Sequence, residues 1–102
     1  MDDDRLARVA RALAHPARVR IVRLLAAHSQ CAGTEVFAGL PLAQSTISQH
    51  LRVLKDAGVV ASHAVGTGSV YCLVPSTLDD FVNAVRESSA GAPECGPETS
   101  AL

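Results

Sequence analysis

The fold is decided by one stretch of the chain, LPLAQSTISQHLRVLKDAGVV, which runs from Leu40 to Val60. On a helical wheel of about 100° per residue, Leu51 and Leu54 lie within about 40° of Ile47. Gly58 follows, where a left-handed residue commonly ends a helix. The pattern predicts a helix over residues 43–57 that turns one apolar edge toward a core.

The opposite edge of this helix carries uncharged polar side chains and one cation. Ser45, Gln49 and Arg52 lie roughly opposite the apolar edge, and Ser48 lies on one flank. Hydroxyls and amides hydrogen-bond to base edges or phosphates, and an arginine neutralises phosphate or reads guanine. A merely solvated helix more often carries Glu and Lys there. This edge therefore favours contact with double-stranded DNA.

Two further helices are predicted toward the N-terminus. Asp4 is the candidate N-cap of the first, and His15 interrupts the apolar period of that helix. Pro16 suits the first position of the second, which is expected to run to about Ala27. Three arginines of this second helix are expected to point outward: Arg18, Arg20 and Arg23.

Short elements are predicted on both sides of the central helix. Residues 29–33 read as an extended segment, and Thr34 is a candidate cap for a short helix through Leu40. Downstream, residues 59–65 and 69–74 read as two strands joined by a Gly66-Thr67-Gly68 turn. Pro75 is expected to end the second strand.

The C-terminal part of the chain is predicted to contain one helix and a tail. Ser76 and Asp79 form a weak capping box before a helix from Leu78 to about Arg86. Residues 87–102 show no apolar period and are predicted to be a disordered tail. Residues 1–86 are then one mainly α domain with a small β-hairpin wing, the order typical of a winged helix-turn-helix.

Three segments carry a resemblance to a known family. ALAHPARVRIVRLL (Ala12–Leu25), the central stretch, and VYCL (Val70–Leu73) after the glycine turn resemble the ArsR/SmtB family of bacterial repressors, over roughly residues 5–86. The resemblance implies a homodimer, built largely from the first and last helices, that places each recognition helix in a major groove of a palindromic operator. It also implies release by a metal, a metalloid or a redox event.

By motif position, the resemblance assigns DNA contacts to six side chains of the central helix. Ser45, Ser48 and Gln49 resemble the family's base-reading positions, and Gln44, Thr46 and Arg52 resemble its backbone contacts.

Two features depart from the family pattern. Ala43 stands where the family often has a capping Ser. The wing carries no Arg or Lys between His63 and Val70, so His63 or Thr67 is expected to contribute only weakly there.

Composition limits the alternatives. The 102 residues are 48% hydrophobic and 3% aromatic, which predicts an aliphatic core and disfavours a stacking platform for single strands. No apolar run reaches the roughly 18 residues of a membrane span, and the N-terminus lacks the features of a secretory signal, so a cytoplasmic protein is expected. No nucleophile elbow, phosphate loop or dinucleotide fingerprint supports an enzyme.

Charge is distributed unevenly along the chain. Residues 5–55 hold eight basic residues and one acid, whereas residues 56–102 hold six acids and one basic residue. A basic half favours a polyanionic partner. The net charge of −1 and the uncharged wing slightly favour an alternative, a winged-helix module for protein contacts. A regulator without an effector site of its own is a further alternative.

The cysteines leave the effector open. The segment before the short helix should pair with the last strand of the wing, which brings Cys31 near Cys72, and Cys95 lies in the tail. The pair is either core, a site for a thiophilic ion such as arsenite, or a reversible disulfide. Nickel or zinc would prefer added imidazoles, for which His63 or His28 is a looser candidate.

Other possible ligands fit less well. The last helix offers Asp79 and Asp80 but no His, so the family's usual site there is not expected to form. His15 is predicted to be a helix cap, and His50 is predicted to pack beside the core instead of reading DNA.

Overall fold

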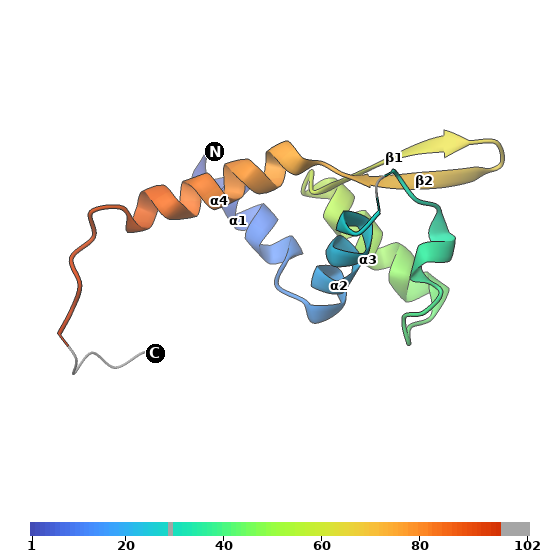
Figure 1. Cartoon of the computed structure of the whole chain (residues 1–102), viewed down its shortest axis with the longest axis horizontal. Coiled ribbons are helices and arrows are strands. Elements are labelled where there is room, and N and C mark those ends of the chain that lie inside the picture. The colour runs from blue at the N-terminus through green and yellow to red at the C-terminus, as the bar shows by residue number, and fades with distance from the viewer. Residues whose placement is uncertain (29, 97–102) are drawn as a thin grey trace.

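The protein folds as a small bundle of helices from which a two-stranded hairpin and a long C-terminal helix extend in opposite directions (Figure 1). The computed structural model describes residues 1–28 and 30–96. The elements are, in chain order, α1 (Asp3–Ala12), α2 (Pro16–Ala26), η1 (Thr34–Phe37), α3 (Gln44–Asp56), β1 (Val60–Val65), β2 (Gly68–Leu73) and α4 (Pro75–Ser89). No helix in these two ranges is long and apolar enough to cross a membrane.

The core lies where α1, α2, η1, α3 and the base of the hairpin meet. Its most deeply buried side chains come from five elements or their junctions, and all are aliphatic or aromatic: Val9, Ile21, Phe37, Leu54 and Val59. The predicted apolar edge of α3 faces this core, because Ile47, Leu51 and Leu54 are all buried. The expectation of an aliphatic core is confirmed, with Phe37 as the aromatic exception.

The N-terminal helices begin with two different caps. Asp2 is the N-cap of α1 and accepts a hydrogen bond from the Arg5 backbone N–H at 2.8 Å, so the prediction that Asp4 is the cap was wrong. His15 caps α2 as predicted, because its Nδ1 accepts from the Ala17 N–H at 3.1 Å and Pro16 occupies the first helical position.

One predicted orientation in α2 was wrong. Arg20 and Arg23 are exposed, but Arg18 is half-buried and forms two hydrogen bonds to other parts of the chain. Its guanidinium reaches α3 and the end of α1, contacts between distant segments that a helical wheel does not show.

The segment between α2 and α3 is less regular than predicted. The extended segment forms a single bridge between Ala32 and Tyr71 instead of a strand, and Ser29 lies outside the described residues. The short helix is a 3-10 turn that ends at Phe37, not at Leu40, and its N-cap is Gly33, with no side-chain bond from Thr34. Glycine at 39 and proline at 41 leave little chain for a longer helix.

The end of α3 is a Schellman motif. Gly58 has φ +78°, the Val59 N–H donates to the Leu54 carbonyl at 3.0 Å, and the Gly58 N–H donates to the Lys55 carbonyl at 2.9 Å. This confirms the predicted left-handed cap and directs the chain into β1.

The hairpin is antiparallel, with Val60 opposite Leu73 and Val65 opposite Gly68. β1 begins one residue later than predicted, and β2 begins and ends one residue earlier than predicted.

The last helix begins earlier than predicted. Pro75 follows the end of β2, as predicted, and also occupies the first position of α4. The N-cap is Val74, which makes no side-chain cap bond, and the predicted capping box of Ser76 and Asp79 is not formed. The helix continues to Ser89, three residues beyond the predicted end. Residues 90–96 form neither helix nor strand, and residues 97–102 of the predicted tail lie outside the described residues.

Candidate nucleic-acid interface

The recognition edge of α3 is open to solvent along its length. Five of the six predicted contact residues are exposed, and Thr46 is half-buried beside the core. The exposed residues are Gln44, Ser45, Ser48, Gln49 and Arg52. The same helix that buries its aliphatic edge therefore presents hydroxyl, amide and guanidinium groups on the other side, the set that hydrogen-bonds to base edges and phosphates.

The N-terminus of α3 has no side-chain cap. Ala43 is exposed and its side chain forms no cap bond, although its carbonyl accepts from the Thr46 and Ile47 N–H groups at 3.0 Å each. The first N–H groups of a helix are left without intrahelical partners and carry partial positive charge. An uncapped terminus next to Gln44 and Ser45 is thus well suited to approach a phosphate.

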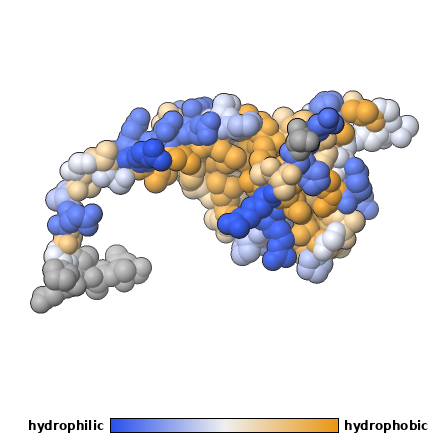
Figure 2. Space-filling view, in the orientation of Figure 1, coloured by the Kyte–Doolittle hydropathy of each residue, from blue (hydrophilic) through white to orange (hydrophobic). Residues whose placement is uncertain are grey.

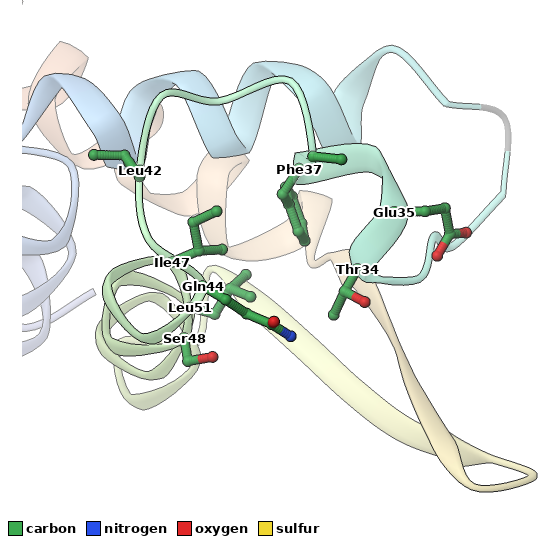
Figure 3. A pocket seen from close by; sticks show the side chains of 9 residues that line it. Thr34, Glu35, Phe37, Leu42, Gln44, Ile47, Ser48 and Leu51 are labelled. Carbon is green, nitrogen blue, oxygen red and sulfur yellow. The ribbon is translucent and has the colours of Figure 1, made fainter.

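A cleft of about 310 Å³ separates η1 from α3. Phe37 from η1 and Ile47 from α3 point into it, whereas Glu35 points away (Figure 3). Gln44 and Ser48 also line the cleft. The cleft between the positioning turn and the recognition helix therefore has both apolar and polar lining.

The wing reaches outward but carries no charge. His63 of β1 is exposed and pairs with Val70, and the turn residue Thr67 is exposed between them. Val65, an exposed large hydrophobic side chain of the wing, is 56% accessible. The wing can offer hydroxyl, imidazole and backbone groups, but not a cation.

Behind the recognition edge, His50 of α3 is buried against α2. The Arg18 Nε donates to the His50 Nδ1 at 3.2 Å, and the rings of His15 and His50 lie 4.6 Å apart between centroids. The Arg18 Nη1 also donates to the Arg11 carbonyl at 3.1 Å, which ties α1 to the same cluster. Burial lowers the pKa of His50 below 6.5, and the nearby His15 and Arg18 lower it further. The prediction that His50 packs is confirmed.

The structure joins Cys31 and Cys72 in a disulfide. The antiparallel bridge brings them together, because the Ala32 N–H donates to the Tyr71 carbonyl at 3.0 Å and the Tyr71 N–H donates back at 2.8 Å. The two Cα atoms are 4.5 Å apart. The predicted proximity of these thiols is confirmed, and Cys95 is exposed with a free thiol.

This arrangement is incomplete as a site for zinc or nickel. Among the residues that the structure describes, no group of three or more His, Cys, Asp or Glu side chains is placed to hold a metal ion. Zinc and nickel prefer four or more ligands, whereas the reduced pair supplies two sulfurs. At the other site, the sequence predicted the missing side-chain cap of α3, because Ala43 stands where the family often has a Ser.

The fold and the interface define a winged helix-turn-helix, in which η1 is the positioning turn, α3 the recognition helix and β1–β2 the wing. Comparison with known proteins places it more closely. Residues 15–62 match the model of the family described as "Bacterial regulatory protein, arsR family". A transcriptional regulator of Methanocaldococcus jannaschii, MJ1325, is 31% identical over 84 residues, which cover 82% of this chain and 94% of that protein. The chain belongs to the ArsR family.

Other relatives agree. The Mycobacterium tuberculosis regulator Rv0081 is 35% identical over 75 residues, but the match spans only 66% of its length, just under two thirds, and 74% of this chain. Its crystal structure superposes with a TM-score of 0.63, 32% identity and coverage of 82% of this chain and 85% of that one. The winged helix-turn-helix domain of Mycobacterium bovis Mb0332, titled a homodimeric DNA-binding domain, gives a TM-score of 0.66 at 25% identity and covers 93% of this chain and 97% of that one. These relatives are named as transcriptional regulators, not as enzymes.

Proposed function

We propose that this protein is a transcriptional repressor that binds a palindromic operator in double-stranded DNA as a homodimer. One observation carries the proposal: α3 buries its aliphatic edge and exposes Ser45, Ser48 and Gln49 beside an uncapped N-terminus. Ser45 and Ser48 supply small hydroxyls, Gln49 supplies an amide that can pair with adenine, and Arg52 supplies a cation for phosphate. Thr46, half-buried, and Gln44 flank this set as backbone contacts.

The dimer is proposed to form through α1 and α4. Val82 and Val85 of α4 are each 48% accessible, and Phe81 beside them is half-buried over a shallow apolar depression. Figure 2 shows continuous hydrophobic surface on this side of the molecule, over the area where α4 lies along α1. The M. bovis domain, which is titled homodimeric, supports a dimer, and the exposed valines of α4 support this surface as its interface. A two-fold dimer would present two α3 helices to the two halves of a palindrome.

The Cys31–Cys72 pair is proposed to be the effector site. In its reduced state it offers two sulfurs to a thiophilic ion such as arsenite, and in its oxidised state it is a disulfide. Nickel or zinc fits less well, because neither His28 nor His63 completes a ligand set with the sulfurs in the described residues.

The test is selection of binding sites from a random duplex library, followed by titration of the selected duplex. We expect a short inverted repeat that binds about a thousandfold more tightly than random duplex, with affinity falling steeply as salt rises. Sedimentation should show two protein chains per repeat.

Equal and weak binding to selected and random duplex at moderate salt would contradict the proposal. That result would favour the second reading, a winged-helix module that contacts other proteins.

A further inference from the structure

The disulfide closes a loop around the whole DNA-reading unit. Cys31 lies three residues before η1, and Cys72 lies in β2, 41 positions later. The closed loop therefore contains η1, α3, β1 and most of β2, which together carry the recognition edge and the wing. The edge-to-face contact of Phe37 with Tyr71, whose ring centroids lie 6.2 Å apart, sits beside this closure and links η1 to β2.

The two sulfur-bearing residues differ in accessibility. Cys31 is exposed, whereas Cys72 is half-buried. Two clefts, of about 460 and 510 Å³, meet at this point, and Cys31 lines both of them while Cys72 lines only the first. An incoming molecule can thus approach Cys31 from two sides but Cys72 from one.

The lining of the first cleft is both apolar and polar. Leu25, Leu73 and Pro75 supply apolar surface, and Gln30 and His28 supply polar groups at its edge. The His28 Nδ1 lies 2.7 Å from the Leu24 carbonyl, which can only accept, so this nitrogen carries the proton.

We propose that the cleft beside Cys31 and Cys72 is a thiol-exchange site for a low-molecular-weight thiol, which attacks the Cys31 Sγ and thereby lowers operator affinity. The regulatory half of this inference rests on the proposed repressor function; the exchange chemistry does not.

The exchange balances in two steps. The thiolate of the small thiol attacks the Cys31 Sγ, a mixed disulfide forms, and the Cys31–Cys72 bond breaks so that Cys72 leaves as a thiolate and takes up a proton. A second thiolate attacks the sulfur of the small molecule in the mixed disulfide. Cys31 leaves and takes up a proton, and the small thiol is released as its own disulfide. Two electrons pass from two small thiols to the protein, and the reverse sequence restores the bond.

Coupling to DNA follows from the position of the bond. With the disulfide closed, a covalent bond ties the segment before η1 to the wing strand β2. After reduction, the paired backbone bonds of Ala32 and Tyr71 and the Phe37–Tyr71 contact still join them, but no covalent bond does. The reading unit then loses part of its preorganisation, and ordering it on DNA costs affinity.

The exchange is tested by mass spectrometry with glutathione as the probe, in a Cys95→Ser background that removes the free thiol of the tail. When reduced glutathione is added to C95S protein with its disulfide closed, the protein should first carry one glutathione and then end with two free thiols. Adding C72S leaves Cys31 alone, and adding C31S leaves Cys72 alone. We expect oxidised glutathione to modify Cys31 about tenfold faster than Cys72, because Cys31 is the more accessible sulfur. Equal rates, or faster modification of Cys72, would overturn the exchange site.

The coupling is tested on the selected operator with the same C95S protein. We expect the dithiol form to bind at least about fivefold more weakly than the disulfide form, and a C31S/C72S/C95S variant to match the dithiol form in every buffer. Equal affinities of the two forms would overturn the coupling. Failure of both forms to bind any selected duplex would overturn the repressor function instead, while the mass-spectrometric result would still stand.

Discussion

The DNA-reading side of the molecule (η1, α3 and the wing) and the α1–α4 side differ in how many contacts within the chain stabilise them. On the reading side, η1, α3 and the wing are closed by a disulfide, a backbone bridge and buried aliphatic contacts. On the other side, α4 packs on α1 and leaves Val82 and Val85 exposed. The reading side is held together within one chain, whereas the α1–α4 side is the surface proposed above to be covered by a second copy. Stability and assembly therefore depend on different residues.

The largest expected effect is on the stability of the reading side. A disulfide that closes a loop of this length, 41 positions apart in sequence, stabilises by about 4 kcal/mol through the entropy of the unfolded chain. We expect C31S/C72S, and wild type in reductant, to lose about this amount in denaturant unfolding. Cys95→Ser is the matched control and should unfold like wild type, because its thiol is exposed and unpaired. A loss below about 1 kcal/mol would show that packing alone closes the reading side.

The second effect is on assembly. Replacing both Val82 and Val85 with Asp places two charges on the proposed dimer surface, and burying them without partners is costly. We expect the dimer dissociation constant to rise about a hundredfold or more in sedimentation equilibrium. The control is Val65→Asp on the wing, a similarly exposed valine. If both variants remain equally dimeric, the α1–α4 side is not the interface.

The third effect separates DNA affinity from stability. Truncating Gln49 to Ala removes an exposed amide from α3 and should cost about 1–3 kcal/mol of operator affinity. The unfolding midpoint should hardly change, because an exposed side chain contributes little to stability. Gln30→Ala, an exposed amide outside α3, serves as the control in the filter-binding or fluorescence titration. Equal losses of affinity in both variants would argue against a reading role for α3.

The same division governs what the sequence predicted. The predicted bounds of α3 agree with the observed bounds to within one residue at each end. The reason is that a clear apolar period precedes a glycine that ends the helix. The sequence predicted Pro16 as the first residue of a helix, whereas it predicted Pro75 only as the residue that ends the second strand and not as the start of α4. Proline suits both roles, so the residue type alone does not show that a helix begins there.

Contacts between distant segments were harder to predict. The bridge that places Cys31 beside Cys72 followed from the expected topology, but the extent of the pairing did not, and one bridge formed instead of a strand. The bond from Arg18 to His50 joins positions 32 apart, which no local pattern encodes. The exposed side chains of the recognition edge were predictable because helical geometry alone fixes them.

The smallest expected effect concerns the contact between α2 and α3 at His50. The pKa of His50 in the folded chain is lowered from 6.5, first by burial and then by His15 and Arg18. Between the lowered pKa and 6.5, the unfolded chain binds more protons than the folded chain, so stability rises with pH across that window. The contribution is fully present above about pH 6.5 and is lost as pH falls through the folded pKa, because protonation removes the acceptor of Arg18 and adds a cation beside it.

A glutamine at this position tests the assignment. In His50→Gln the amide oxygen can still accept from the Arg18 Nε, but it does not titrate, so unfolding free energy should depend less on pH below about 6.5 than in wild type. His63→Gln, on the exposed face of β1, is the control and should keep the wild-type profile. If His50→Gln keeps that profile too, acid sensitivity arises elsewhere, and the contact that holds the recognition helix on α2 depends on the shape of the His50 ring, not on its protonation state.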